Sequence, residues 1–264
     1  MPEIIMPQAR SLPISTHRVT PWTAALAGAI CLGGLAFGTL EAWPLWATGL
    51  AVVLPWIPVF ARQVAWVYWR YGWLALFYVL VVGQTGHFLE HVAQMIQIHV
   101  LGFEGAGARG IFGTLDIEWV HFIWNTWVLL VVLVLLGRFR ANRWLWVALL
   151  LCGWHEVEHV AIFRVYLMTG VSGTPGILSQ GGALAGGLPV SRPDLHFFYN
   201  LIETIPLVVG FLAQVQRMIH EWRQRLLESP RLPTAAYLER LIEKHSNHGS
   251  QHAESSTRFR SAFE

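Results

Sequence analysis

The sequence predicts an all-α polytopic membrane protein of about six transmembrane helices, in which a duplicated two-helix unit forms a four-helix core. Charged residues make up only 13% of its 264 residues and hydrophobic residues 54%, whereas soluble domains carry about 25% charged residues. This composition excludes an ordinary soluble domain and a disordered protein. Apolar runs of about 20 residues, the length that crosses a bilayer, recur along the chain, and a histidine motif occurs twice.

Charge and cysteine content exclude further classes. The formal net charge of +2 is too small for a nucleic-acid-binding protein. The chain has only two cysteines, Cys31 and Cys152, and both lie in apolar runs, which excludes a disulfide scaffold and a thiolate metal cluster. What the composition leaves is a protein of the lipid bilayer with 14 tryptophans and 12 histidines.

The apolar runs define the expected organisation. We expect spans at Pro21–Leu40, Pro44–Ala61, Tyr71–Val100, Ile117–Gly137, Asn142–Met168 and Leu195–Val215. The third is long enough to tilt or to project from the bilayer. The expected segments are an N-terminal stretch (1–20), two buttressing helices (21–63), a first His-rich repeat (64–138), a second (139–217) and an amphipathic tail that becomes disordered (218–264).

Basic residues predict the orientation, because they concentrate on the cytoplasmic side. Arginines precede the first span, lie between spans two and three, fill the link between spans four and five, and follow span six. The two long Gly-rich connections, Gly102–Leu115 and Gly170–Pro193, are poor in basic residues. We therefore expect both termini in the cytoplasm and both Gly-rich loops outside. The first 20 residues lack the layout of a signal peptide, so the first span is expected to stay as an anchor, in a bacterial plasma membrane.

Three motifs recur in the same order, which indicates an internal duplication. The pairs are H-x-x-E-H-V-A from His87 and His155, G-x-x-G-I from Gly107 and Gly173, and H-F-x-(aromatic)-N from His121 and His196. Each repeat is an outgoing helix, a Gly-rich loop and a returning helix. Two spans per unit preserve orientation, so the repeats should be parallel rather than inverted.

The repeated polar residues predict a metal site at one depth under the Gly-rich loops. Positions i, i+3 and i+4 share one helix face, so each H-x-x-E-H segment projects two imidazoles and a carboxylate together. Burying these groups in a bilayer without a cation is costly. Imidazole and carboxylate suit iron, manganese, zinc or copper rather than calcium or magnesium. The candidate ligands of two transition-metal ions, with iron preferred and zinc or copper as alternatives, are His87, Glu90, His91, His121, His155, Glu158, His159 and His196.

Other polar residues near these positions are candidates for outer-shell contacts or proton transfer. Glu203 lies seven residues beyond His196, where the first repeat has Val128. An intramembrane carboxylate is functional by default, with structural pairing as the alternative reading. The remaining candidates of this kind are Asn125, Asn200, Glu156 and Gln84. The sequence assigns no catalytic residue.

Three functions follow as alternatives. The first is a di-iron oxidoreductase that acts on a lipid or other apolar substrate and receives electrons from a donor protein. The second is a zinc hydrolase, because the segment from His155 to His159 satisfies both H-E-x-x-H and H-x-x-E-H. The third is a non-enzymatic haem or chlorin carrier or a metal transporter. The Gly-rich loops are either a lid over the site or plain connections.

Overall fold

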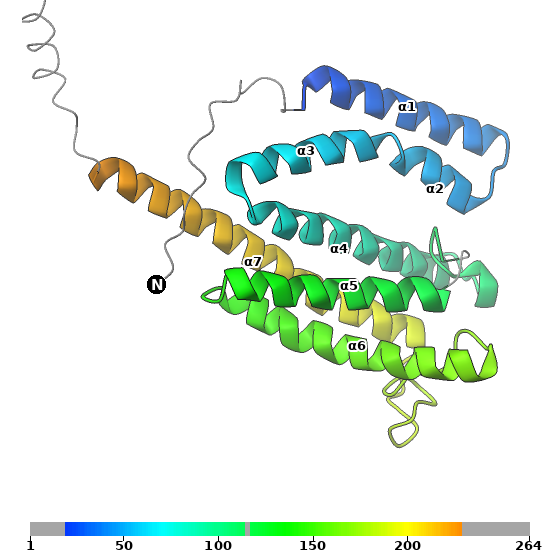
Figure 1. Ribbon diagram of the computed structural model, residues 1–264. Coiled ribbons are helices and arrows are strands. Elements are labelled where there is room, and N and C mark those ends of the chain that lie inside the picture. Colours follow the sequence, from blue (N-terminus) through cyan, green and yellow to red (C-terminus); the bar gives the residue numbers. More distant parts are fainter. Residues whose placement is uncertain (1–18, 114–116, 229–264) are drawn as a thin grey trace, which may run out of the picture. The chain divides into compact units, whose positions relative to one another are not determined.

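The computed structural model describes residues 19–113 and 117–228, and this part of the chain is helical with no β-strand (Figure 1). The predicted all-α class is confirmed. The helices are α1 (Pro21–Leu40), α2 (Leu45–Val53), α3 (Trp56–Tyr71), α4 (Leu74–Met95), α5 (Ile117–Arg138), α6 (Arg143–Thr169) and α7 (Arg192–Glu228). A π-helix, η1 (Ile96–Val100), continues α4, and a 3₁₀ turn, η2 (Gly105–Gly107), follows it.

Within residues 19–113 and 117–228, four helices are long and apolar enough to cross a membrane, namely α1, α5, α6 and α7. The pair α2 and α3, bent by 42° at its break, adds a fifth span if it is counted as one. The predicted count of six is therefore not reproduced. Helix α4 fills the predicted third span but falls outside this group, because Gln84, His87, Glu90 and His91 interrupt its apolar run. The second predicted span ended at Ala61, whereas α3 continues to Tyr71.

Side-chain burial follows the pattern of a protein surrounded by lipid. Large apolar side chains face outward, and Leu150 is 74% exposed. Polar side chains face inward: Gln84, Glu158 and Asn200 are fully buried. Because a soluble protein places charged groups outside and apolar groups inside, this inverted distribution agrees with the membrane assignment.

Specific residues cap both ends of helix α6, and one of them also bonds α7. Asn142 is the N-cap of α6. Its Oδ1 accepts a hydrogen bond from the backbone N–H of Trp144 at 3.1 Å, which satisfies one otherwise unpaired donor of the first helical turn. The Nδ2 of Asn142 donates to the carbonyl of Gly210 in α7 at 2.8 Å. Helix α6 ends at Gly170, which adopts the left-handed conformation that closes helices.

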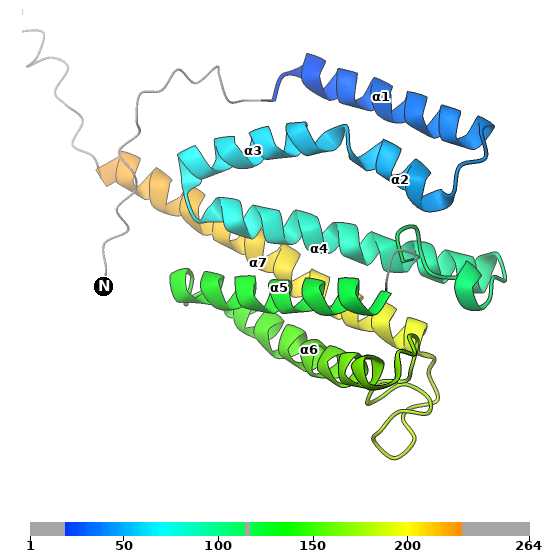
Figure 2. The same cartoon turned by 45° about the vertical axis from the view of Figure 1, so that its right-hand side comes forward.

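Helices α4, α5 and α6 and the N-terminal part of α7 lie side by side in both views (Figures 1 and 2). At one end Phe77 of α4 is fully buried and contacts the rings of Phe139 and Phe211, with centroids 6.2 and 5.5 Å away. His91 lies 14 residues further along α4, which is about 20 Å at 1.5 Å per residue. The apolar packing thus holds one end of the bundle, and the polar residues gather toward the other.

The chain divides into two compact units, Met1–Gln214 and Val215–Glu264. The first part of the predicted amphipathic tail, from Met218 to Glu228, is helical and continues α7 without interruption. The rest of the predicted tail, with His245, His248 and His252, lies outside the described residues. The boundaries of the predicted repeats stay a prediction.

Candidate metal centre

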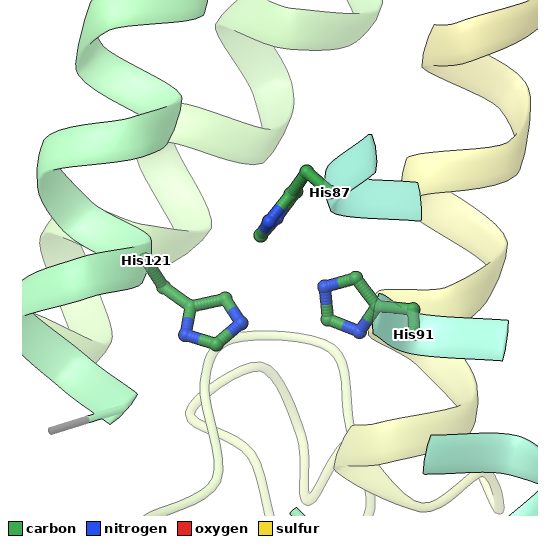
Figure 3. Close-up of side chains that lie close together, drawn as sticks. All are labelled: His87, His91 and His121. Atoms are coloured by element: carbon green, nitrogen blue, oxygen red, sulfur yellow. The ribbon is translucent and has the colours of Figure 1, made fainter. Parts of the chain in front are cut away.

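Six histidines from four helices gather in two groups of three. The first triad is His87 and His91 of α4 with His121 of α5, and the second triad is His155 and His159 of α6 with His196 of α7. Within each triad, one ring nitrogen per residue lies within 4.8 Å of the others. Figure 3 shows the three rings of the first triad turned toward a common space between α4 and α5. The helix pairing therefore matches the sequence prediction.

The two triads adjoin each other. The rings of His121 and His159 stack at an interplanar angle of 12° with centroids 5.8 Å apart. His91 and His196 form a second contact between the triads, with centroids 6.3 Å apart. Ring distances within a triad, such as 4.9 Å between His159 and His196, are only slightly shorter. The six imidazoles form one continuous cluster.

Several buried nitrogens of this cluster have no hydrogen-bond partner. They are Nε2 of His87, both ring nitrogens of His91, and Nε2 of His196. Buried polar atoms are almost always paired, so four unpaired nitrogens in one place are a strong exception. In the second triad, Nε2 of His155 and Nε2 of His159 face each other at 3.1 Å. One of these two nitrogens donates to the other when no ion is bound, and the unpaired nitrogens of His87, His91 and His196 offer the lone pairs that a bound cation requires.

The two motif glutamates are directed to the Gly-rich loops instead. Glu90 Oε1 accepts hydrogen bonds from the backbone N–H groups of Phe112 at 2.6 Å and Gly113 at 3.3 Å. Glu158 Oε1 accepts from Ile177 at 2.8 Å and Leu178 at 3.4 Å. Neither histidine triad includes a carboxylate. The sequence placed both glutamates among the ligands because they share a helix face with the histidines, but each carboxylate reaches past the ring level to a loop.

Glycines make this approach feasible. A Cβ at Gly110 or at Gly176 would overlap the Oε1 atom of Glu90 or of Glu158, respectively. These are the second glycines of the two G-x-x-G-I motifs. The motifs singled out in the sequence are therefore the places where each loop receives its glutamate.

Glu203 contacts the second triad directly. Its Oε1 lies 3.0 Å from Nδ1 of His155, and both side chains are 1% exposed. A carboxylate acceptor at Nδ1 selects the tautomer that leaves Nε2 of His155 for a metal. His196 has a similar support, because its Nδ1 lies 3.1 Å from the carbonyl oxygen of Arg192.

The other polar candidates form a layer beneath the imidazoles. The Nδ2 atoms of Asn125 and Asn200 each donate at 2.9 Å to a carbonyl four residues earlier, that of His121 and of His196. Gln84 donates to Oδ1 of Asn200 at 3.0 Å and accepts from the indole of Trp124 at 3.0 Å. This layer joins α4, α5 and α7 below the rings.

Glu156 lies apart from the imidazole cluster. Its Oε1 accepts a hydrogen bond from the hydroxyl of Thr126 at 2.7 Å. This hydrogen bond links α6 to α5. The glutamate of the H-E-x-x-H pattern therefore makes a contact between two helices.

The sequence reasoning missed one buried ion pair. Arg192 at the start of α7 contacts Glu118 at the start of α5 through two bonds of 2.8 Å. Glu118 also accepts from the backbone N–H of Gly173 at 2.8 Å, and Arg192 donates to the carbonyl of Thr174 at 3.1 Å. Both residues lie at the starts of the helices that carry the returning histidines, and this shared position was the one indication in the sequence. No sequence pattern places one residue beside the other.

A pocket of about 220 Å³ opens onto the histidines between the two loops. Its lining includes His91, His121 and His196, together with Arg109 of the first loop and Ser172 of the second. Both Gly-rich loops therefore line a route to the cluster.

The chemistry available at this centre is that of a buried set of six imidazoles, supported by carboxylate and carbonyl acceptors and reached through a pocket. No family model, no curated protein and no solved structure matches this chain.

Proposed function

We propose that this chain is an integral membrane metalloprotein that binds two transition-metal ions in adjacent three-histidine sites and acts as an oxidoreductase. The observation that carries the proposal is the convergence of six imidazoles in two triads, with unpaired nitrogens directed into the cluster. Three protein ligands leave coordination positions open on each ion. A pair of redox-active ions in these adjacent triads would supply electron transfer to a small molecule bound between or beside them.

The donor set favours copper over iron. Iron was preferred while Glu90 and Glu158 counted as ligands, because non-haem iron sites combine imidazole with carboxylate. Each carboxylate gives one oxygen to loop backbone, and neither belongs to a triad, so imidazole dominates the donor set. Among divalent first-row ions, copper binds such nitrogen sites most tightly. We therefore propose a copper pair, with iron as the second choice.

The pocket offers polar and charged groups that a small polar substrate can contact. Its lining includes Arg109, Arg192 and Ser172 alongside the histidines. The apolar substrate expected from the sequence would meet these polar groups at the loop side. The cytoplasmic position of both termini remains part of the proposal and rests on the arginine distribution alone. The electron-donor protein follows only from the proposed oxidoreductase chemistry.

A parallel duplication of the two-helix unit is also part of the proposal. Two matched sets of contacts support it: Glu90 and Glu158 each receive a Gly-rich loop, and Asn125 and Asn200 each bond the carbonyl of a histidine. The same side-chain types therefore make the same contacts in both halves.

A zinc hydrolase has less support, because it needs a carboxylate free to activate water. Glu158 gives Oε1 to loop backbone and Glu156 gives Oε1 to Thr126, and neither carboxylate belongs to a triad. A haem or chlorin also fits poorly, since the imidazoles that would flank a macrocycle lie against other imidazoles, as His121 does against His159.

The test is metal analysis of the purified full chain with absorption and electron paramagnetic resonance spectra. We expect two copper ions per chain, and one ion lost in each of His91→Ala and His159→Ala. His99→Ala is the matched control, because the side chain of His99 is 57% exposed and pairs with Asp194 outside the triads. A Soret band, or full metal content in both triad variants, would overturn the proposal. Two redox-silent zinc ions would remove the oxidoreductase assignment and keep the metal sites.

A further inference from the structure

The two triads have the same ligands but different surroundings. In the second triad, the carboxylate of Glu203 lies 3.0 Å from Nδ1 of His155. The corresponding position in the first repeat is Val128, which is buried and apolar. The first-triad counterpart of His155 is His87, whose ring stacks on Trp124 at 5.3 Å. Glu203 therefore supports a ligand of the second triad from a position that is apolar in the first repeat.

A carboxylate behind a ligating imidazole raises the basicity of the ligand, and loss of such a partner lowers metal affinity about 10–100-fold. His155 and His159 are also almost completely buried, at 0% and 1% exposure. The second triad thus combines a ligand supported by a carboxylate with the more enclosed position.

The pocket is lined by more histidines of the first triad than of the second. Of the three histidines in its lining, His91 and His121 belong to the first triad and His196 to the second. A molecule that enters from the loops therefore meets the first triad with two of its three ligands.

Arg109 gives this pocket a positive charge. It lies in the first Gly-rich loop, half-buried, and lines the pocket. Within the described residues, no hydrogen bond or ion pair engages its guanidinium. The other arginine of the pocket, Arg192, is neutralised by Glu118. One uncompensated cation beside an accessible metal position favours a small anion as the ligand.

We propose that the two metal positions divide their roles: the second triad holds a tightly retained ion, and the first triad holds the ion that binds a small anionic ligand through the pocket, with Arg109 as its counter-charge. The inference rests on the proposed two-metal function. Glu203 is a positioning residue in this scheme, because it acts through His155.

The test titrates the metal-free full chain with Cu²⁺ and follows azide binding by its charge-transfer absorption. The first equivalent should fill the second triad and stay silent to azide, and the second equivalent should respond. In Glu203→Gln, the Cu²⁺ affinity of the second triad should fall about 10–100-fold. The azide charge-transfer band should then appear from the first equivalent of Cu²⁺. Glu203→Asp, which keeps the carboxylate, should restore much of the order of filling.

A second arm tests the anion. Arg109→Gln should weaken azide binding roughly tenfold or more, the loss expected for one charge-assisted contact, and leave both copper affinities unchanged. Arg164→Gln is the control, because Arg164 is exposed on α6 and does not line the pocket. Unchanged azide binding in Arg109→Gln would overturn the anion site.

The failures of the two proposals are distinguishable. A chain that binds fewer than two copper ions refutes the two-metal function itself. A chain that binds two ions with equal affinity, both responsive to azide, keeps the function and refutes the division of roles.

Discussion

Oε1 of Glu158 accepts a hydrogen bond of 2.8 Å from the backbone N–H of Ile177, and so anchors the second Gly-rich loop over the histidines of its own half. Glu90 makes the equivalent contact with Phe112 at 2.6 Å. Hydrogen bonds to an ionised acceptor are roughly twice as strong as neutral ones. The two loops are therefore held by carboxyl groups on the helices that carry the histidine pairs, and the position of each loop is coupled to its triad.

Glu158→Gln and Glu90→Gln should retain both metal ions and loosen the loops. Glutamine keeps an acceptor but loses the charge, which should cost about 1–3 kcal/mol of stability for each variant. Thermal unfolding in detergent measures this loss, and limited proteolysis within residues 170–191 reports on the second loop. Loss of a metal ion from either variant would show that the glutamate is a ligand after all.

Gly176→Ala should disrupt the same contact from the loop side. The new Cβ would collide with Oε1 of Glu158 and approach Ile162 Cδ1 at 3.1 Å, so either the loop or the carboxylate must move. We expect faster proteolysis of the loop and a lower unfolding temperature. Gly33→Ala is the matched control, because a Cβ at Gly33 meets nothing within 4 Å and alanine favours the helix. Equal behaviour of the two variants would contradict the anchoring role.

The sequence predicted the histidine cluster more accurately than its glutamates. His87 and His91 share a helix face by spacing alone, and the repeated motif order was enough to pair them with His121 across a loop. The direction of Glu90 could not be predicted, because its partners are backbone N–H groups of a loop whose course depends on glycine conformations. The partnership of Glu118 with Arg192 joins residues 74 positions apart, which no local pattern encodes. Composition indicated a membrane protein, but the polar residues of α4 made its span the least certain.

The ion pair of Glu118 and Arg192 should couple α5, α7 and the second loop. Removal of one partner of a buried pair leaves an uncompensated charge and costs about 3–5 kcal/mol. Glu118→Gln and Arg192→Gln should each be destabilising, and the double variant should be less destabilised than the sum by about 2 kcal/mol. A double-mutant cycle of unfolding free energies measures this coupling, and additive effects would show that the pair contributes no interaction of its own.

Removal of metal should lower the stability of the histidine end of the bundle more than that of the other end. A ligand that binds only the folded state stabilises it by about 2.7 kcal/mol at a free concentration 100 times its Kd. In the metal-free protein, the imidazoles of His91 and His196 keep their unpaired buried nitrogens, which weakens the packing of α4 against α7. Hydrogen exchange should therefore rise after chelation around residues 87–91 and 155–159. It should change little around Phe77, where the aromatic contacts with Phe139 and Phe211 do not involve metal. A uniform rise along α4, or none at all, would contradict a metal that ties these helices at the histidine level, and addition of copper back to the chelated protein should reverse the local rise.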